Sequence, residues 1–391
     1  VRVSSASFRA YGSSCPFDAL SIMVREAHSR GLSIHAWINP MRLMSDADIK
    51  GISDSYKIKQ WYNSDDLRGK YIVKVNGTWY LNPAYSETVS LIADGVSEIV
   101  SKYNVDGIQI DDYFYPTTDR SFDSAAYSAS GTSSGLAEWR MSMVSNMVRK
   151  LYSAVKNVNS TAVFGISPQG SISNNYNDLY ADVKTWCSQS GYVDYILPQI
   201  YYGFNNSTLP YSDTCAAWSS LVKNSNVKLV IGLAPYKIGT EDTWAGNGKF
   251  EWANNTDIIA RQMAFAETLP NYGGVALYRY DSLFNPTAGV SAAVKAEIAK
   301  QHGIEWEQKG THEEHLDVYN FKKKERKKEV QELEQKKEYL TAENEGLVFQ
   351  VAEARADIKL LEEEKNQLQK DKETAEKSCN CRIGFIMAFS W

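Results

Sequence analysis

Six segments of the chain share one pattern, in which a run of apolar residues ends in polar, aromatic, glycine or proline residues. The segments span residues 32–40, 106–116, 162–170, 193–204, 228–239 and 273–284. A short apolar run bounded in this way is typical of a strand that is buried on both faces of a parallel sheet. Helical patterns separate the segments, for example at residues 17–31 and 136–158. The first 300 residues therefore alternate between strand and helix.

This alternation predicts a parallel sheet whose strands are connected by crossover helices. The polar and aromatic residues gather where the strands end, which favours a (β/α)8 TIM-type barrel of the α/β class. A doubly wound sheet is the alternative. The sequence contains no G-x-G-x-x-G or P-loop motif to support it.

Alternation along each strand predicts which side chains face the barrel axis. In the segment GIQIDDYF, Ile108 and Ile110 pack under the helices, which places Gln109 and Asp111 on the axis. Asp112 then begins the loop. The same parity directs a further set of polar and aromatic side chains inward, namely His35, Trp37, Asn39, Gln199, Tyr201 and Tyr236.

Carboxylates at the ends of barrel strands are the usual tools of sugar chemistry. Asp111 and Asp112 are therefore the leading catalytic candidates, with Glu241 and Asp242 as further carboxylates in a later loop. Sugar hydroxyls need hydrogen bonds and sugar rings need aromatic platforms, which gives the candidate substrate-binding residues His35, Trp37, Asn39, Arg42, Tyr113, Tyr115, Gln199, Tyr201, Tyr202 and Tyr236.

Two other aspartates, Asp106 and Asp194, stand at the beginnings of predicted strands. Strand beginnings form the bottom of a barrel, where residues serve stability and not catalysis. We therefore predict structural roles for both.

Two mechanisms are open for the catalytic carboxylates. In the first, Asp111 is the nucleophile or base and Glu241 or Asp242 is the acid, at about 5–5.5 Å for retention or about 6.5–9.5 Å for inversion. In the second, an acetamido group of the substrate is the nucleophile, and one aspartate of the adjacent pair orients it while the other protonates the leaving oxygen. A structural alternative is that Asp112 only caps the loop and Asp111 acts alone.

Six motifs resemble, in order and spacing, the bacterial glycosyl-hydrolase-like family 10: HAWINPMR, DGIQIDDYFYP, FGISPQG, VDYILPQIYY, IGLAPYKIG and GGVALYRYDS. The resemblance covers about residues 1–300. It implies a barrel enzyme of the bacterial envelope that acts on a polysaccharide, and some members are similar to enzymes that cut peptidoglycan glycan strands. We expect no cofactor and no metal.

The chain departs from this family at its beginning. Members usually start with a strand, a helix and a second strand ending in a VRP-like motif, and Val1 and Arg2 resemble the end of that second strand. We therefore expect a barrel that lacks its first strand and most of its second. The sequence has no initiator Met and no signal peptide, so we expect cell-envelope or secreted localisation only of the intact parent enzyme.

Composition changes near residue 300. Residues 301–391 hold 36 charged residues among 91, against 53 among the first 300. A heptad repeat begins at residue 330, with Asn344 at an a position and the d positions occupied by Leu333, Leu340, Leu347, Ala354, Leu361 and Leu368. This repeat predicts a self-associating coiled coil over residues 330–377, and a single solvated helix is the alternative. A basic linker at 301–329 precedes it, and an unstructured tail at 378–391 follows.

Residues 303–330 resemble the segment that joins the nicking domain of plasmid mobilization (Mob/Pre) relaxases to their coiled coil, and the resemblance extends over about residues 301–377. The residues with which a relaxase cuts DNA have no counterpart here. An envelope barrel followed by a DNA-processing tail indicates a recombined or misassembled gene.

Other features weigh against further binding functions. The net charge of −5 gives no nucleic-acid signature, and the basic run at 322–328 is typical of a solvated face beside a coiled coil. His312 and His315 have no further ligands nearby that would complete a metal site. Five scattered cysteines give no disulfide framework, and the apolar end at 383–391 is too short to span a bilayer.

The competing functions make different demands on the residues. A non-catalytic carbohydrate-binding barrel needs Trp37, Tyr113, Tyr115 and Tyr201, but it does not need an inward Asp111. A DNA-associated fragment of a plasmid mobilization protein would use only the tail.

Overall fold

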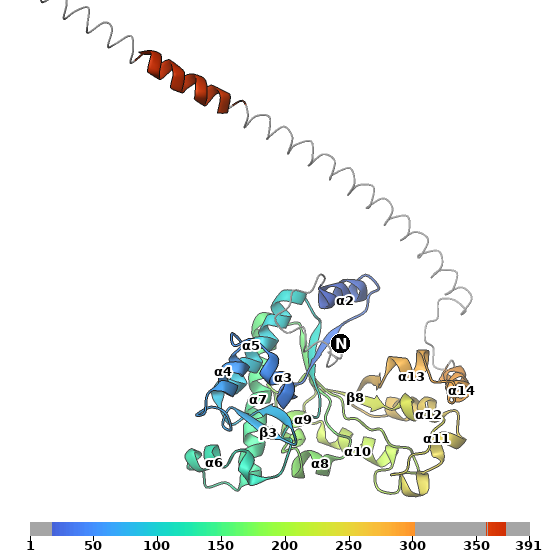
Figure 1. Cartoon of the computed structure of the whole chain (residues 1–391). Coiled ribbons are helices and arrows are strands. Elements are labelled where there is room, and N and C mark those ends of the chain that lie inside the picture. Colours follow the sequence, from blue (N-terminus) through green and yellow to red (C-terminus); the bar gives the residue numbers. More distant parts are fainter. Residues whose placement is uncertain (1–17, 302–356, 358, 373–391) are drawn as a thin grey trace, which may run out of the picture. The chain divides into compact units, whose positions relative to one another are not determined.

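The computed structural model describes residues 18–301, 357 and 359–372 (Figure 1). The chain divides into two units, residues 1–304 and 305–391, and each is described by itself.

The first unit is built on a six-stranded parallel sheet in the order β1-β5-β6-β7-β8-β9. These strands are β1 (His35–Ile38), β5 (Gly107–Ile110), β6 (Val163–Ile166), β7 (Tyr195–Ile196), β8 (Lys228–Leu233) and β9 (Tyr272–Leu277). Spatial order follows chain order, so these strands contain none of the order reversal that defines a doubly wound sheet. The fold is α/β with a TIM-like parallel sheet. Among the described residues, β1 and β9 each pair with one parallel strand.

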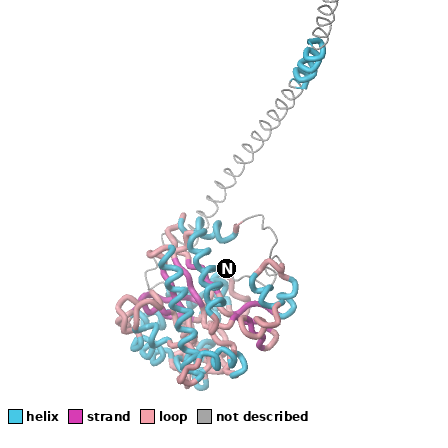
Figure 2. The backbone as a smooth tube through the Cα atoms, turned by 90° about the vertical axis from the view of Figure 1, so that its left-hand side faces the viewer, coloured by secondary structure: helices cyan, strands magenta, loops and turns pink. Residues whose placement is uncertain are grey.

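Helices connect the strands and pack on the outer side of the sheet (Figures 1 and 2). The longer ones are α2 (Ala19–His28), α5 (Ser86–Tyr103), α7 (Leu136–Val158), α10 (Tyr211–Leu221), α12 (Ile258–Glu267) and α14 (Ser291–Gln301). The shorter ones are α3 (Asp46–Gly51), α4 (Lys57–Asn63), α6 (Ser124–Ser130), α8 (Ile172–Asn177), α9 (Val183–Ser188), α11 (Glu251–Asn254) and α13 (Tyr280–Phe284), with 3₁₀ turns at Arg120–Phe122, Pro235–Lys237 and Gly246–Gly248. In α7, the buried residues Val144, Met147, Val148, Leu151 and Val155 recur at three- and four-residue steps, which gives the helix its core-facing stripe.

A small antiparallel sheet interrupts the alternation between β1 and β5. Its order is β2-β4-β3, with β2 at Arg42–Ser45, β3 at Ile72–Val75 and β4 at Thr78–Leu81. Asn76 and Gly77 join β3 to β4 with φ angles of 48° and 81°, as a two-residue hairpin turn requires. The sheet was not among the predicted elements, and it brings Arg42 to the region where β5 ends.

Two aspartates fasten the beginnings of the strands. Asp106 Oδ2 accepts hydrogen bonds from the Ile34 N–H at 2.7 Å and from His28 Nε2 at 2.8 Å. Asp194 Oδ2 accepts from the Phe164 N–H at 2.7 Å and forms an ion pair with Lys156. Both contacts join neighbouring chain segments at the bottom of the sheet, as predicted for structural residues.

Above Asp106 and Asp194, side chains that point toward the barrel axis contact one another. His35 Nδ1 lies 2.9 Å from the Tyr195 hydroxyl, which donates to Gln109 Oε1 at 3.1 Å. The Tyr195 ring occupies space above Gly165, where a Cβ atom would lie 1.9 Å from the ring. The side chains on the axis of β1, β5 and β7 thus form a connected floor.

The second unit is described only over 357 and 359–372, where residues 359–372 are helical. The heptad residues Leu361 and Leu368 are 63% and 69% exposed in this helix. The linker, most of the predicted coiled coil, the terminal tail, His312 and His315 lie outside the described residues. No helix within the described ranges is long and apolar enough to cross a membrane.

Candidate active site at the carboxyl ends of the strands

Asp111 and Asp112 follow β5 directly, at the carboxyl end of the sheet. Gln199 Nε2 donates to Asp111 Oδ1 at 2.5 Å and to the Ser167 carbonyl at 3.0 Å. The Asp112 backbone N–H donates to the same Asp111 oxygen at 2.9 Å. Asp111 is thereby held from two directions, and the contact with Gln199 agrees with the parity that places both side chains on the axis.

The surroundings of Asp111 favour its neutral form. Burial, followed by repulsion from the Asp112 carboxylate, raises the pKa of Asp111 to about 7, although the hydrogen bonds from the Asp112 N–H and Gln199 oppose the rise. The adjacent pair can therefore retain one proton near neutral pH. A carboxyl group that keeps its proton near neutral pH can serve as a general acid.

Three tyrosines form an aromatic cluster beside this pair. The Tyr201 and Tyr278 rings stack with centroids 6.0 Å apart, and Tyr236 meets both edge-on at 5.9 and 6.1 Å. Tyr236 and Tyr278 are 44% and 49% exposed. Burial raises the pKa of Tyr201, so its phenol remains a hydrogen-bond donor at neutral pH.

Arg42 and Tyr113 meet near the same pair. The Arg42 guanidinium carbon lies 5.9 Å from the centre of the Tyr113 ring, and Tyr113 is 43% exposed. Burial and the charges of Asp111 and Asp112 raise the pKa of Tyr113, and the positive charge of Arg42 opposes this. This cation–π pair places a positive charge and a hydrogen-bonding phenol near the carboxylates.

A pocket of about 490 Å³ opens next to Asp112. Its volume falls in the range of about 300–1,000 Å³ that is usual for small-molecule sites. The sequence candidates in its lining are Asp112, Gln199, Tyr201, Tyr202, Tyr236 and Asp242. Further lining residues are Gln169, Gly170, Asn206, Thr208, Leu209, Lys237 and Trp244.

Glu241 and Asp242, the two carboxylates of the loop after β8, each form an ion pair with a lysine. Asp242 is 6% exposed and forms a 2.6 Å ion pair with Lys237, which also donates to the Tyr201 carbonyl at 2.7 Å. A carboxylate held by a cation in this way is a poor proton donor. Glu241 is paired with Lys249 at 3.0 Å and is absent from the pocket lining. The assignment of either residue as the catalytic acid stays a prediction.

Tyr115 does not face a substrate, which corrects its prediction as a binding residue. Only 1% of it is exposed, because it packs edge-on against Phe122 and Tyr180 and lies under the Arg140 guanidinium. Two positions after the exposed Tyr113, the loop has already turned into the core.

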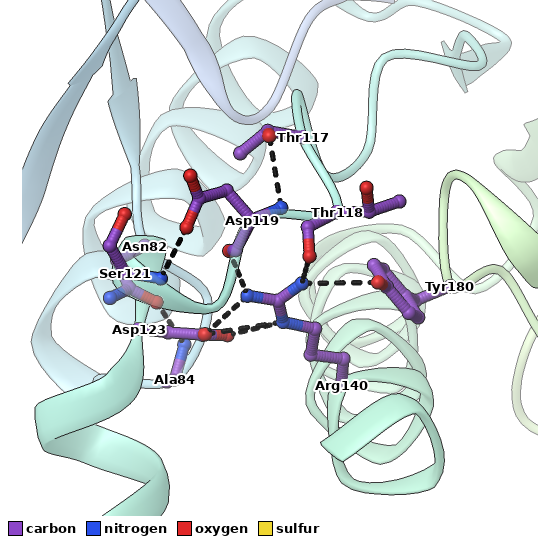
Figure 3. A network of polar contacts seen from close by, with 9 residues as sticks. All are labelled: Asn82, Ala84, Thr117, Thr118, Asp119, Ser121, Asp123, Arg140 and Tyr180. Atoms are coloured by element: carbon purple, nitrogen blue, oxygen red, sulfur yellow. Dashed lines mark hydrogen bonds and ion pairs between the residues drawn. The ribbon is translucent and has the colours of Figure 1, made fainter.

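The guanidinium of Arg140 fastens this loop from beneath (Figure 3). Arg140 donates to both carboxylate oxygens of Asp123, with distances of 2.6 Å to Oδ1 and 2.9 Å to Oδ2, and both side chains are fully buried. It also donates to the carbonyls of Thr118 and Asp119, at 3.2 and 2.6 Å, and to the Tyr180 hydroxyl at 3.1 Å. The segment that begins with the catalytic candidates is thus tied to α7.

The residues of β1 lie further from the carboxyl ends of the strands than predicted. His35 is in register with Gly107, four residues before Asp111, which is about 13 Å along a strand. His35 therefore belongs to the floor and not to the substrate-binding surface. Trp37 is in register with Gln109 and lies one level higher. Asn39 Oδ1 accepts from the Arg42 N–H at 3.2 Å, so this side chain supports the turn that leads to β2.

A family model described as glycosyl hydrolase-like 10 matches residues 9–246. The chain belongs to this family. Glycosyl hydrolase DigH of Escherichia coli is 31% identical to the chain over 293 residues, which are 69% of this chain and 65% of DigH. Glycosyl hydrolase YngK of Bacillus subtilis is 33% identical over 305 residues, which are 72% of this chain and 56% of YngK. The chain thus spans less than two thirds of the length of these relatives.

The chain is also similar to a solved glycoside hydrolase domain. The glycoside hydrolase domain of PgaB from Bordetella bronchiseptica has a TM-score of 0.44 and 11% identity, and covers 68% of this chain and 76% of that one.

Most of the site lies in the part of the chain matched by the glycosyl hydrolase-like 10 model, but Tyr278 lies beyond it. Tyr278, Lys237 and Trp244 were absent from the predicted site. Tyr278 had a usable signal, because it follows the last predicted strand as Asp111 follows β5. Lys237 and Trp244 belong to a long loop whose course no periodic pattern predicts.

Proposed function

We propose that this protein is a glycosidase that cleaves an N-acetylated polysaccharide of the bacterial cell envelope, with the glycan strands of peptidoglycan as its substrate. The observation that carries the proposal is the adjacent carboxyl pair, which keeps a proton to about pH 7 beside a pocket and an aromatic cluster. Family membership supports the reaction class. The resemblance of the six strand-end motifs to envelope enzymes supports the substrate.

The adjacent-pair mechanism fits this geometry better than the distant-acid mechanism. Asp111 carries the proton and donates it to the leaving glycosidic oxygen, because burial raises its pKa. Asp112, which lines the pocket, is the anion that orients the acetamido group of the substrate. The acetamido oxygen attacks the anomeric carbon, the bond to the leaving oxygen breaks, and water later opens the cyclic intermediate.

Asp111 and Asp112 also distinguish the proposed glycosidase from a non-catalytic sugar-binding barrel. Such a barrel needs the exposed tyrosines, but nothing in sugar binding requires two neighbouring carboxyls that repel each other. Mutual repulsion that raises the pKa of a carboxyl group is typical of sites where a proton is transferred. It therefore supports catalysis.

The decisive experiment is hydrolysis of purified glycan strands. Denuded peptidoglycan, stripped of its peptides, is incubated with the full chain, and soluble saccharides are separated by chromatography and identified by mass. We expect release from acetylated strands, a rate that falls above about pH 7 as Asp111 loses its proton, and little release from the same strands after chemical N-deacetylation. Equal rates on both preparations would exclude the acetamido mechanism, and no release from either would refute the proposed activity.

We further propose that the heptad segment, residues 330–377, is a coiled coil of two or more copies. The exposed Leu361 and Leu368 support this, since an isolated helix would leave them in water. A peptide covering residues 327–377 should sediment as an oligomer at micromolar concentration. A monomer at high micromolar concentration would exclude self-association by this segment.

A further inference from the structure

Trp244 stands apart from the other aromatic residues of the pocket. It is 90% exposed, although it lines the same pocket as Asp112 and Gln199. An indole gains much from leaving water, so a sugar ring that stacked on this side chain would be stabilised. A flexible loop would give such a side chain no fixed direction.

The backbone beneath Trp244 is instead tightly held. The Trp244 N–H donates to Asp242 Oδ1 at 3.3 Å, and the Asp242 N–H donates to the Lys249 carbonyl at 2.9 Å. The Lys237 ammonium joins Asp242 to the Tyr201 carbonyl. The loop after β8 is thereby connected to the segment that carries Tyr201.

A second set of contacts joins this loop to the loop after β7. The Ser207 N–H donates to the Ala245 carbonyl at 3.0 Å, and the Asn247 N–H donates to Ser207 Oγ at 2.8 Å. The buried Glu251 carboxylate accepts from the backbone N–H groups of Phe204 and Asn205, at 3.1 and 2.8 Å. The two loops form one wall of the pocket, with Trp244 on it.

We propose that Trp244 is the stacking platform of a second sugar position, which binds a neutral ring of the same glycan strand beyond the ring held at Asp111 and Asp112. This inference rests on the proposed function and adds the direction and minimum length of its substrate. The charges support a neutral ring, because the Lys237 cation that lines the pocket is matched by Asp242. Gln169, Asn206 and Thr208 provide uncharged hydrogen-bonding groups beside it.

The test compares Trp244→Ala with the parent on denuded glycan strands. Loss of the platform should raise KM about 10- to 100-fold, as burial of one large aromatic side chain implies, while kcat stays within about threefold. Trp244→Phe should recover most of the affinity. Phe250→Ala is the matched control, because Phe250 is a 49% exposed aromatic residue of the same loop that does not line the pocket.

A binding measurement locates the effect directly. In an Asp111→Asn background, glycan strands should protect tryptophan fluorescence from iodide quenching, and Trp244→Phe should abolish this protection. A parent-like KM for Trp244→Ala, or protection that survives Trp244→Phe, would overturn the second sugar position. An inactive parent would instead refute the proposed function.

Discussion

Asp111 and Asp123 stand at the two ends of one loop, and both are withdrawn from water. Asp123 meets the Arg140 guanidinium in a bidentate, fully buried ion pair. Asp111 meets a neutral amide and a second carboxylate. Complete charge compensation makes the first aspartate an anchor, whereas burial beside a second carboxylate raises the pKa of Asp111, which is the basis of its proposed role as the acid.

The loop after β8 contains a second carboxylate that is paired with a cation. Asp242 lines the pocket, yet Lys237 neutralises it and turns it into a support for the backbone of Trp244. The presence of a carboxylate in the pocket therefore does not identify the acid. In the proposed mechanism, the acid is identified by the charge of the nearest partner of each carboxylate.

The largest expected effect is on catalysis at the uncompensated pair. Asp111→Asn should lower kcat on glycan strands by at least 10²- to 10⁴-fold, because it removes the transferable proton and preserves the shape. Asp112→Asn should cause a large loss too, because the acetamido group is no longer oriented.

Glu241→Gln is the control, since its ion pair with Lys249 lies outside the pocket. It should keep nearly the parent rate. A large loss with Glu241→Gln and a small loss with Asp112→Asn would favour the distant-acid mechanism. An Asp111→Asn protein that cleaves at the parent rate would remove the site assignment altogether.

The next effect is on stability at the compensated pair. Arg140→Met leaves the Asp123 charge buried without a partner, and should lower the free energy of unfolding by about 3–5 kcal/mol. The measurement is urea denaturation followed by circular dichroism. Lys102→Met removes an exposed partner of Glu98 and should leave stability nearly unchanged. Equal losses in the two variants would show that the Arg140 pair is not an anchor.

A further effect on stability has the opposite sign and depends on pH. The folded-state pKa of Asp111, about 7, lies above its ordinary value of 3.8. Between these values the folded protein keeps a proton that the unfolded chain has released, so the contribution of Asp111 to stability falls as pH rises from about 4 to 7. Asp111→Asn abolishes this titration and should be more stable than the parent at pH 8.

The difference in Tm between Asp111→Asn and the parent should therefore grow from pH 4 to pH 8. Asp123→Asn should lose stability at pH 7, because it breaks the buried ion pair. A difference for Asp111→Asn that stays constant with pH would mean that the carboxyl titrates normally.

The sequence predicted the parallel strands because each is a short apolar run with a clear end. The helix over residues 136–158 was predicted with the bounds of α7, since its apolar residues keep one period throughout. The antiparallel sheet was missed, although its strands are no shorter than β1, β5 and β6. The Asn76-Gly77 turn between alternating apolar residues was the available signal. The absence of the first barrel strands and the coiled coil remain predictions, because residues 1–17 and most of the tail lie outside the described range.

The candidate site was predictable where parity along a strand decides the direction of a side chain. Gln199 and Asp111 are in contact, as their shared axial position requires. Parity could not show how far along the barrel a residue lies, which is why His35 was placed too high. It also could not show that Tyr115 turns into the core, because this depends on contacts with Arg140 and Tyr180, which are distant in the chain. The ion pair of Asp242 with Lys237 is local, but it lies in a loop where strand parity gives no direction.

The floor of the site depends on Gly165, which has no Cβ atom. Gly165 leaves room for the Tyr195 ring, whose hydroxyl links His35 to Gln109 beneath the carboxylates. A complete set of single substitutions should therefore show intolerance at Gly165 even to alanine, while Tyr195→Phe survives with only the hydrogen bonds lost. For anyone who redesigns this protein toward another glycan, the exposed side chain of Trp244 is open to substitution, whereas Gly165 is not.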